Sequence, residues 1–120
     1  MIASAQAELI ASGIPASHVT LHRAPGSFEI PVIGAALAEA RAVSGLIGLG
    51  IIVEGETHHA DLLAREVARG LMEVQVRYRV PFAFEVLYVT SLEQARQRLD
   101  RGTEAARAVL QSLSELQKIT

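Results

Sequence analysis

The chain has 120 residues, half of them hydrophobic, which is enough for one domain with a single buried core. A net charge of −2 gives no reason to expect nucleic-acid binding, and a sequence without cysteine excludes disulfide and thiolate chemistry. The sequence has no apolar run of about 18 residues and no basic start followed by an apolar signal core, so it predicts a cytoplasmic protein. Lys118 is the one lysine among eleven basic residues, so a lysine Schiff base is not expected and anion binding would use arginine or backbone amides.

The first part of the chain predicts a helix, a strand and a second helix. Residues 1–12 are alanine-rich with an apolar stripe, and Gly13 is suited to end the helix that they form. Residues 19–23 alternate between apolar and polar side chains, which predicts a strand near a sheet edge. After a turn at 25–27, residues 28–42 predict a helix with Pro31 in its first turn.

The rest of the chain alternates between strands and helices. Residues 45–53 are apolar or glycine without alternation, as in a strand buried on both faces. There follow a helix at 57–78, a strand at 81–89, a helix capped by Ser91 that reaches about residue 99, and a last helix from 102 or 103 to about 116. This order predicts an α/β protein, a three-layer α/β/α sandwich with a parallel sheet.

The junction between strand 45–53 and helix 57–78 is the predicted functional site. In open α/β sheets, ligands bind beyond the carboxyl ends of strands, where helix N-termini offer free N–H groups. His58 and His59 lie there, and because neighbouring helix residues point about 100° apart, at most one of them faces a pocket. The N-terminus of a helix disfavours the cationic form of histidine, so such an imidazole can accept a proton near neutral pH. The histidines could equally be polar residues of a solvated loop with no function in a site.

Other candidate sites have weaker signals. His58 and Asp61 share a helical face near Glu54 and Glu56, but zinc needs three or four convergent ligands and the sequence has no second His or Cys cluster. The glycines of the junction form neither a GxGxxG motif nor a Walker loop, so we interpret them as residues that allow close packing.

Two further groups of side chains could bind parts of a ligand. Phe28 beside Glu29 could stack on a flat heterocycle and accept hydrogen bonds from a polyol, or could be a core ring beside a glutamate that favours the helix dipole. The same two interpretations apply to Phe84. The arginines at 96, 98 and 101 predict a solvated face, or a phosphate site if they abut the His59 loop.

Two motifs together match one family. They are Pro-Gly-Ser-Phe-Glu-Ile-Pro at 25–31 and Gly-Ile-Ile-Val-Glu-Gly-Glu-Thr-His-His-Ala-Asp at 50–61, and the match continues through Glu66, Gly70, 80–84, 92–95 and Arg98. By these residues the chain resembles 6,7-dimethyl-8-ribityllumazine synthase, the penultimate enzyme of riboflavin biosynthesis. The resemblance covers nearly the whole chain and implies a flavodoxin-like topology. It also implies a transferase that condenses 5-amino-6-(D-ribitylamino)uracil with 3,4-dihydroxy-2-butanone 4-phosphate, without metal or organic cofactor.

The resemblance assigns roles to individual residues. It makes His59 the proton-transfer histidine and aligns His58 with a variable position. The residues implied for the pyrimidine and its ribityl chain are Ser27, Phe28, Glu29, Ile51, Ile52, Val53 and Phe84, the last of them from a neighbouring subunit. Those implied for the phosphate are Glu56, Thr57, Arg98 and Arg101, with Arg101 at roughly the place of a family lysine. The chemistry agrees in outline, because one neutral imidazole can shuttle the protons of such a condensation between two aligned substrates.

The resemblance also implies expectations about the domain and its partners. The family has a strand before its first helix, central in the sheet and ending in an aromatic residue, and this chain begins after it. We therefore expect residues 1–120 to form a single domain of this type that lacks the first strand, either because natural residues are missing or because the chain is a divergent or engineered form. The implied partners are other subunits of a pentamer, in some members a capsid of twelve pentamers, and riboflavin synthase. The alternative functions are a non-catalytic assembly or flavin- or pterin-binding protein on the same scaffold, and a flavodoxin-like regulatory domain.

Overall fold

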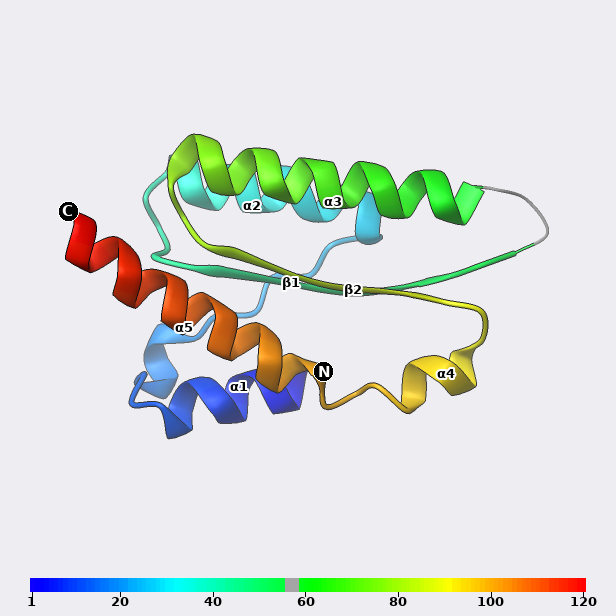
Figure 1. Cartoon of the computed structure of the whole chain (residues 1–120), viewed down its shortest axis with the longest axis horizontal. Coiled ribbons are helices and arrows are strands. Elements are labelled where there is room, and N and C mark those ends of the chain that lie inside the picture. The colour runs from blue at the N-terminus through cyan, green and yellow to red at the C-terminus, as the bar shows by residue number, and fades with distance from the viewer. Residues whose placement is uncertain (56–58) are drawn as a thin grey trace.

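The sheet consists of two parallel strands, β1 (Leu46–Val53) and β2 (Phe82–Val89), in the computed structural model, which describes residues 1–55 and 59–120. Leu46 lies opposite Phe82 and Val53 lies opposite Val89, so the carboxyl ends of both strands lie at the same end of the sheet (Figure 1). Helix α3 (His59–Tyr78) connects them, as a parallel pair requires.

Helices α2 (Ile30–Glu39) and α3 cover one face of the sheet (Figure 1). The apolar stripe of α3 provides the most buried side chains of the core, and it packs on the even-numbered residues of β2, which face this layer. Small residues allow the close approach. A methyl group at Gly34 of α2 would clash with the ring of Phe82, and one at Gly70 of α3 would lie 2.8 Å from Cγ of Pro31. These contacts hold both helices against each other and against the sheet.

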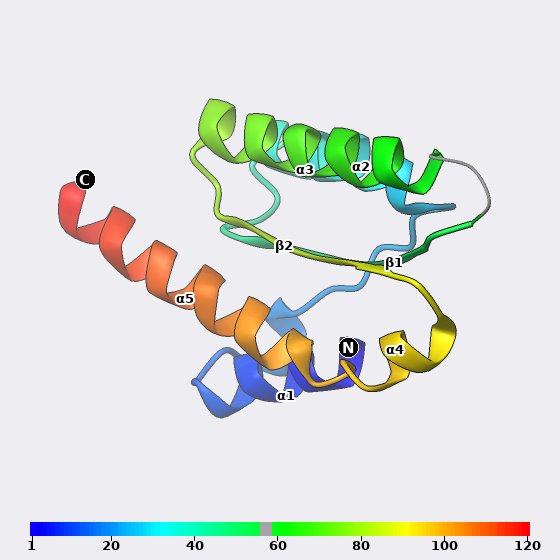
Figure 2. The same cartoon turned by 45° about the vertical axis from the view of Figure 1, so that its right-hand side comes forward.

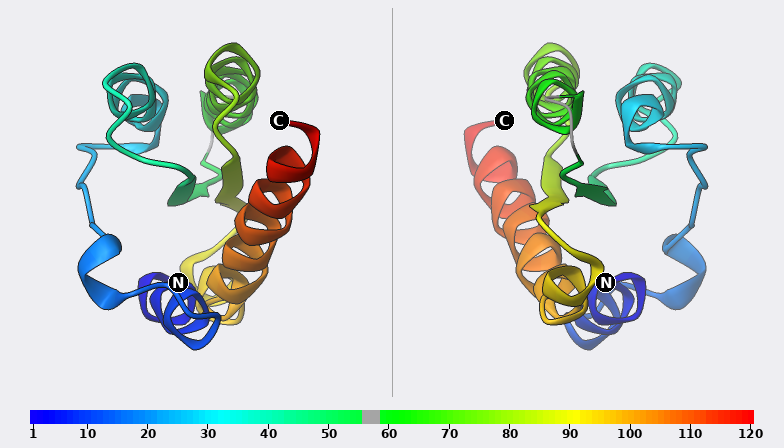
Figure 3. Two further views of the ribbon diagram at one scale, coloured as in Figure 1. Left: turned by 90° about the vertical axis from the view of Figure 1, so that its left-hand side faces the viewer. Right: turned by 90° about the vertical axis from the view of Figure 1, so that its right-hand side faces the viewer.

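Helices α1 (Ile2–Ala11), α4 (Leu92–Arg96) and α5 (Arg101–Ile119) lie on the opposite side of the sheet (Figures 1 and 3). Helix α5 packs on β2, and α1 packs on α5. The hydroxyl of Ser4 donates to the carbonyl oxygen of Leu99 at 3.0 Å, and Nε of Arg107 donates to Oε1 of Glu8 at 3.0 Å. Through these bonds α1 is attached to α5 and to Leu99 in the turn before it. Two short 3-10 turns, η1 (Ala16–His18) and η2 (Ser27–Glu29), interrupt the connection from α1 to α2.

The predicted α/β class, with helices on both faces of a parallel sheet, is confirmed. The strands at 45–53 and 81–89 form within one residue of their predicted starts. Ser91 caps α4 as expected, since its Oγ accepts a hydrogen bond from the backbone N–H of Gln94 at 3.1 Å. The end of that helix differs, because α4 stops at Arg96, and α5 extends further than expected, to Ile119. The predicted cap at Thr57 lies outside the described residues.

The prediction of a strand at residues 19–23 is wrong. Between η1 and η2 the described chain has no strand, and the sheet has two strands where three were expected. The physical reason is that an extended segment becomes a strand only by pairing with another backbone, and no described strand lies beside residues 19–23. None of the described helices is both long and apolar enough to cross a membrane.

Candidate active site

The carboxyl ends of β1 and β2 lie at one edge of the sheet, beside the first turn of α3 (Figure 2). His59 is the first residue of α3, and its side chain is exposed, whereas the neighbouring Ala60 is buried in the core. The packing of Ala60 orients this first helical turn, which leaves the imidazole on its solvent side. Histidine at this position is within the positive end of the helix dipole, as predicted.

The turn η2 comes close to the same part of the sheet, packing on both β1 and α3. A methyl group at Gly50 would lie 2.8 Å from Oγ of Ser27, so glycine at this position of β1 permits the approach. Phe28 is 60% exposed, so its ring is not a core side chain. Glu29 is half-buried and precedes α2 without capping it through its side chain. This exposure contradicts the interpretation of Phe28 as a core ring, while contact of the pair with a ligand stays a prediction.

The residues at the end of β1 divide between the core and the surface. Ile52 is buried under α2 and α3, while Ile51 and Val53 point to the other side of the strand and are exposed. Phe84 lies in the middle of β2, opposite Gly48, and is exposed as well. Phe84 therefore does not lie at the carboxyl ends of the strands, where His59 lies.

The three arginines near α4 lie in different environments. Arg96 pairs with Glu93 at 3.7 Å and Arg101 pairs with Glu85 at 3.9 Å. Arg98 is half-buried in the turn between α4 and α5, and within the described chain it makes no ion pair shorter than 4.0 Å. Arg98 is therefore the arginine of this group that is least committed to a carboxylate.

The structure brings some of the predicted site residues together and keeps others apart. His59, η2 and the end of β1 lie at the carboxyl ends of the strands, on the face of the sheet that α2 and α3 cover. Arg98 and Arg101 lie on the opposite face, with α4 and α5 (Figure 2). Glu56, Thr57 and His58 lie outside the described residues. Among the residues that are described, no group of three or more His, Cys, Asp or Glu side chains converges in a way that could hold a metal ion.

One contact at this edge was not found from the sequence. The hydroxyl of Tyr88 near the end of β2 donates to Oε1 of Glu54, the residue after β1, at 3.1 Å. No local motif signals such a pair, because it depends on the alignment of two strands separated by a long helix.

A second electrostatic feature is Glu85 on β2. Burial raises the pKa of its carboxyl group, and the charge of Arg101 lowers that pKa only in part.

Comparison with known proteins shows the family to which the chain belongs. A profile of the family described as 6,7-dimethyl-8-ribityllumazine synthase matches residues 1–117. The chain belongs to this family. A lumazine synthase of Albidiferax ferrireducens is 36% identical over 115 residues, which cover 95% of this chain and 73% of the relative. Lumazine synthases of an Acidovorax species and of Verminephrobacter eiseniae are 34% and 35% identical over 121 residues, each alignment covering 100% of this chain and 79% of the relative.

Proposed function

We propose that this chain is a lumazine synthase, a transferase of riboflavin biosynthesis that condenses 5-amino-6-(D-ribitylamino)uracil with 3,4-dihydroxy-2-butanone 4-phosphate. The observation that carries the proposal is the family match over residues 1–117. The position of His59 in the first turn of α3, at the carboxyl edge of both strands, supports it. A site at this edge is where α/β sheets bind their ligands.

Each side chain has a role in the proposed reaction. Forming an imine between the amine and the ketone, eliminating phosphate and closing the ring all require proton transfers, and the imidazole of His59 accepts and returns these protons. The exposed ring of Phe28 stacks on the pyrimidine, and the carboxylate of Glu29 accepts hydrogen bonds from the ribityl hydroxyls. Arg98, which the single chain holds on the α4–α5 side of the sheet, binds the phosphate in the site of a neighbouring subunit through its guanidinium group. Arg101 is a weaker candidate for the phosphate, because it would have to leave Glu85.

The remaining contacts in the proposal come from the family resemblance. Ser27 and the exposed Ile51 and Val53 flank the pyrimidine, and the buried Ile52 contributes backbone groups only. Phe84 reaches the site of a neighbouring subunit, which agrees with its exposure in the single chain and its distance from the strand ends. The backbone amides of Glu56 and Thr57 would bind the phosphate.

We further propose that the chain self-associates as a pentamer in the cytoplasm, with a capsid of twelve pentamers and a complex with riboflavin synthase as the larger assemblies. Exposed apolar side chains on and beside helices α2 and α3 support association, namely Phe28, Val32, Leu62, Met72 and Val76. Sedimentation velocity distinguishes a monomer, a pentamer and a capsid by mass. A monomer at micromolar concentration would contradict this part of the proposal.

The activity is tested by following lumazine formation through its absorbance in steady-state assays. His59→Ala is expected to lower kcat by about a hundredfold or more, since general acid–base catalysis contributes that much. His18→Ala is the matched control, because His18 is also exposed but lies at the end of η1, remote from the strand ends. Turnover that survives His59→Ala unchanged would contradict the role of His59. Binding of ribitylaminouracil without any turnover would favour the non-catalytic binding protein instead.

A further inference from the structure

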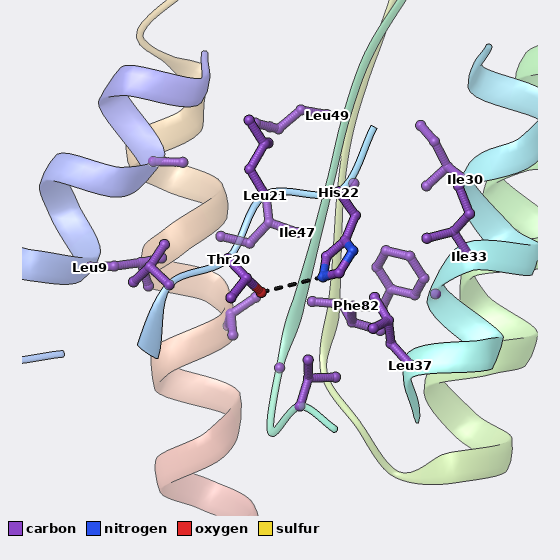
Figure 4. Close-up of a pocket in the computed structure, with 18 of the residues that line it drawn as sticks. Leu9, Thr20, Leu21, His22, Ile30, Ile33, Leu37, Ile47, Leu49 and Phe82 are labelled. Carbon is purple, nitrogen blue, oxygen red and sulfur yellow. Dashed lines mark hydrogen bonds between the residues drawn. The ribbon is translucent and has the colours of Figure 1, made fainter. Parts of the chain in front are cut away.

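Glu85 is a charged residue on a face of the sheet that is otherwise apolar. On its own side of β2 it alternates with Ala83 and Leu87. On β1 it lies opposite Leu49, and Figure 4 shows Leu49 and Ile47 on the side of that strand that faces α1. Carboxylates are rarely placed among such neighbours unless a partner stabilises the charge. The role of Glu85 therefore depends on the cation beside it.

The cation beside Glu85 is Arg101, the first residue of α5. Its Nη1 lies 3.9 Å from Oε1 of Glu85, and 14% of the Glu85 side chain is exposed, against 45% for Arg101. This separation is longer than a hydrogen bond of about 2.7–3.2 Å, so the pair is held by charge alone. Burial raises the pKa of Glu85 despite this cation, and the charge of Glu104 in the first turn of α5 raises it further. Arg101 thus neutralises Glu85 only in part, and its exposed guanidinium group can contact a second anion.

Arg101 lies one backbone turn after Arg98, the residue proposed above to bind the phosphate. The N–H of Arg101 donates to the C=O of Arg98 at 3.1 Å, which fixes the two residues relative to each other. Side chains three residues apart in a helical turn begin about 5–6 Å from each other, and the long side chain of arginine can cover that distance. A phosphate on the guanidinium group of Arg98 therefore lies within reach of Arg101 and competes with Glu85 for it.

We propose that Glu85 is a positioning residue of the phosphate site, which holds Arg101 in the free chain and takes it back from the phosphate after the reaction. While phosphate is bound to Arg98, Arg101 leaves Glu85 and contacts the phosphate as a second cation. When Arg101 returns to Glu85, the phosphate loses that contact, and inorganic phosphate, a product of the proposed reaction, is released more easily. This inference rests on the proposed function, which assigns the phosphate to Arg98.

A competing carboxylate matters because phosphate remains a strong ligand after it has been eliminated. Product release limits the turnover of many enzymes, and two arginines without a competing anion would bind the product as well as they bind the substrate. Glu85 lowers the affinity for both. Its half-buried position suits this role, because the carboxylate regains a stabilising cation whenever the phosphate leaves.

Two simpler roles for the pair predict other results. An ion pair that only holds α5 against β2 would affect stability and leave phosphate binding unchanged. A general repulsion between Glu85 and any nearby anion would weaken phosphate binding whether or not Arg101 is present. The proposed role differs from both, because it requires that the effect of Glu85 on phosphate depend on Arg101.

The test measures the equilibrium binding of inorganic phosphate to the full chain by calorimetry at pH 8. Glu85→Gln is expected to bind phosphate about two- to fivefold more tightly than the natural chain, since an ion pair of this exposure contributes about that factor. Glu104→Gln is the matched control, because it removes a negative charge from the first turn of α5 and keeps the pair of Glu85 with Arg101. The control should change the affinity by less than about twofold.

The part played by Arg101 is tested by combining variants. Adding Arg101→Ala to Glu85→Gln should weaken phosphate binding by at least the factor gained, whereas adding Glu85→Gln to Arg101→Ala should change little. If Arg101→Ala alone fails to fold, the first of these comparisons decides, because neither of its chains has a half-buried carboxylate without a cation. In steady-state kinetics, Glu85→Gln should lower the KM for the butanone phosphate and strengthen inhibition by inorganic phosphate by the same factor, and should leave the KM for the pyrimidine unchanged.

The outcomes separate this proposal from the enzyme activity on which it rests. Equal phosphate affinity in the natural chain and in Glu85→Gln would overturn the role of Glu85, as would an equal gain with and without Arg101, or no binding of phosphate to any of these chains. Absence of turnover together with a gain in phosphate affinity that requires Arg101 would contradict the enzyme activity and support the role of Glu85. Turnover with an unchanged phosphate affinity would contradict the role of Glu85 alone.

Discussion

Tyr88 and Glu54 join the two strands at their carboxyl ends through a hydrogen bond of 3.1 Å from the phenol to the carboxylate. The register makes this possible, because Ile52 lies opposite Tyr88 and Glu54 follows two residues later. Burial of the ring against the core under α3 raises the pKa of Tyr88, and the hydrogen bond and charge of Glu54 raise it further. The phenol therefore keeps its proton, and the bond persists, throughout the neutral range.

Replacing Tyr88 by phenylalanine is expected to lower the free energy of unfolding slightly, since it removes this exposed hydrogen bond and keeps the ring. Tyr78→Phe is the matched control, because the ring of Tyr78 contacts Arg77 and its hydroxyl has no hydrogen-bond partner within the described chain.

The stabilisation by Tyr88 also depends on pH. The folded protein holds the proton of Tyr88 more tightly than the unfolded chain, in which the pKa of tyrosine is about 10. The stabilisation is thus complete below about pH 10 and is lost as the pH rises further. Urea unfolding at pH 8 and pH 11 measures both effects, and equal losses in the two variants at pH 8 would contradict this account.

Glu85→Gln is expected to leave the protein as stable or slightly more stable at neutral pH, by about 1 kcal/mol at most. Burial raises the pKa of Glu85 despite the ion pair with Arg101, so the fold favours the protonated carboxyl. Its contribution to stability is therefore present below the unfolded pKa of about 4 and is lost as the pH rises through the folded value. Thermal unfolding between pH 4 and pH 7 should show a shallower decline for the variant. A steeper decline would mean that the pair with Arg101 outweighs burial.

Gly102→Ala is expected to lower the free energy of unfolding by about 1 to 3 kcal/mol, as overpacking does. A methyl group at this buried position would clash with the carbonyl oxygen of Met1 and lie 2.5 Å from Oγ of Ser4, so α1 would have to move away from α5. Gly55→Ala is the control, because a methyl group there meets no heavy atom within 4 Å among the residues described. Denaturant unfolding compares the two, and similar midpoints would show that α1 shifts without loss.

Arg98→Ala is expected to raise the KM for the butanone phosphate by about tenfold, with a smaller change in the KM for the pyrimidine, because one charge-assisted contact to the phosphate is lost. Arg96→Ala is the matched control, since Arg96 is exposed and pairs with Glu93 within the same helix. Steady-state kinetics with each substrate varied in turn make the comparison. An equal rise for both substrates would point to a structural effect of the turn after α4.

Much of the local structure could be inferred from neighbouring residues in the chain. The uninterrupted apolar and glycine run before Val53, the stripe of α3 and the cap at Ser91 are local signals, and the structure has each element near its predicted place. The paired motifs around Phe28 and His59 also led to the family that the comparisons show. These properties depend on backbone preferences and side-chain periodicity, which residues carry wherever they lie in the fold.

The long-range contacts decided the rest. Residues 19–23 have the alternation of a strand but form none, because pairing requires a second backbone beside them. The sequence left Phe28 open between core and ligand contact, and its exposure followed from how η2 packs on β1 and α3. The pairs Tyr88 with Glu54 and Arg101 with Glu85 likewise depend on strand register and on the approach of α5 to β2. Such contacts join residues far apart in the chain, so no short stretch of sequence contains them.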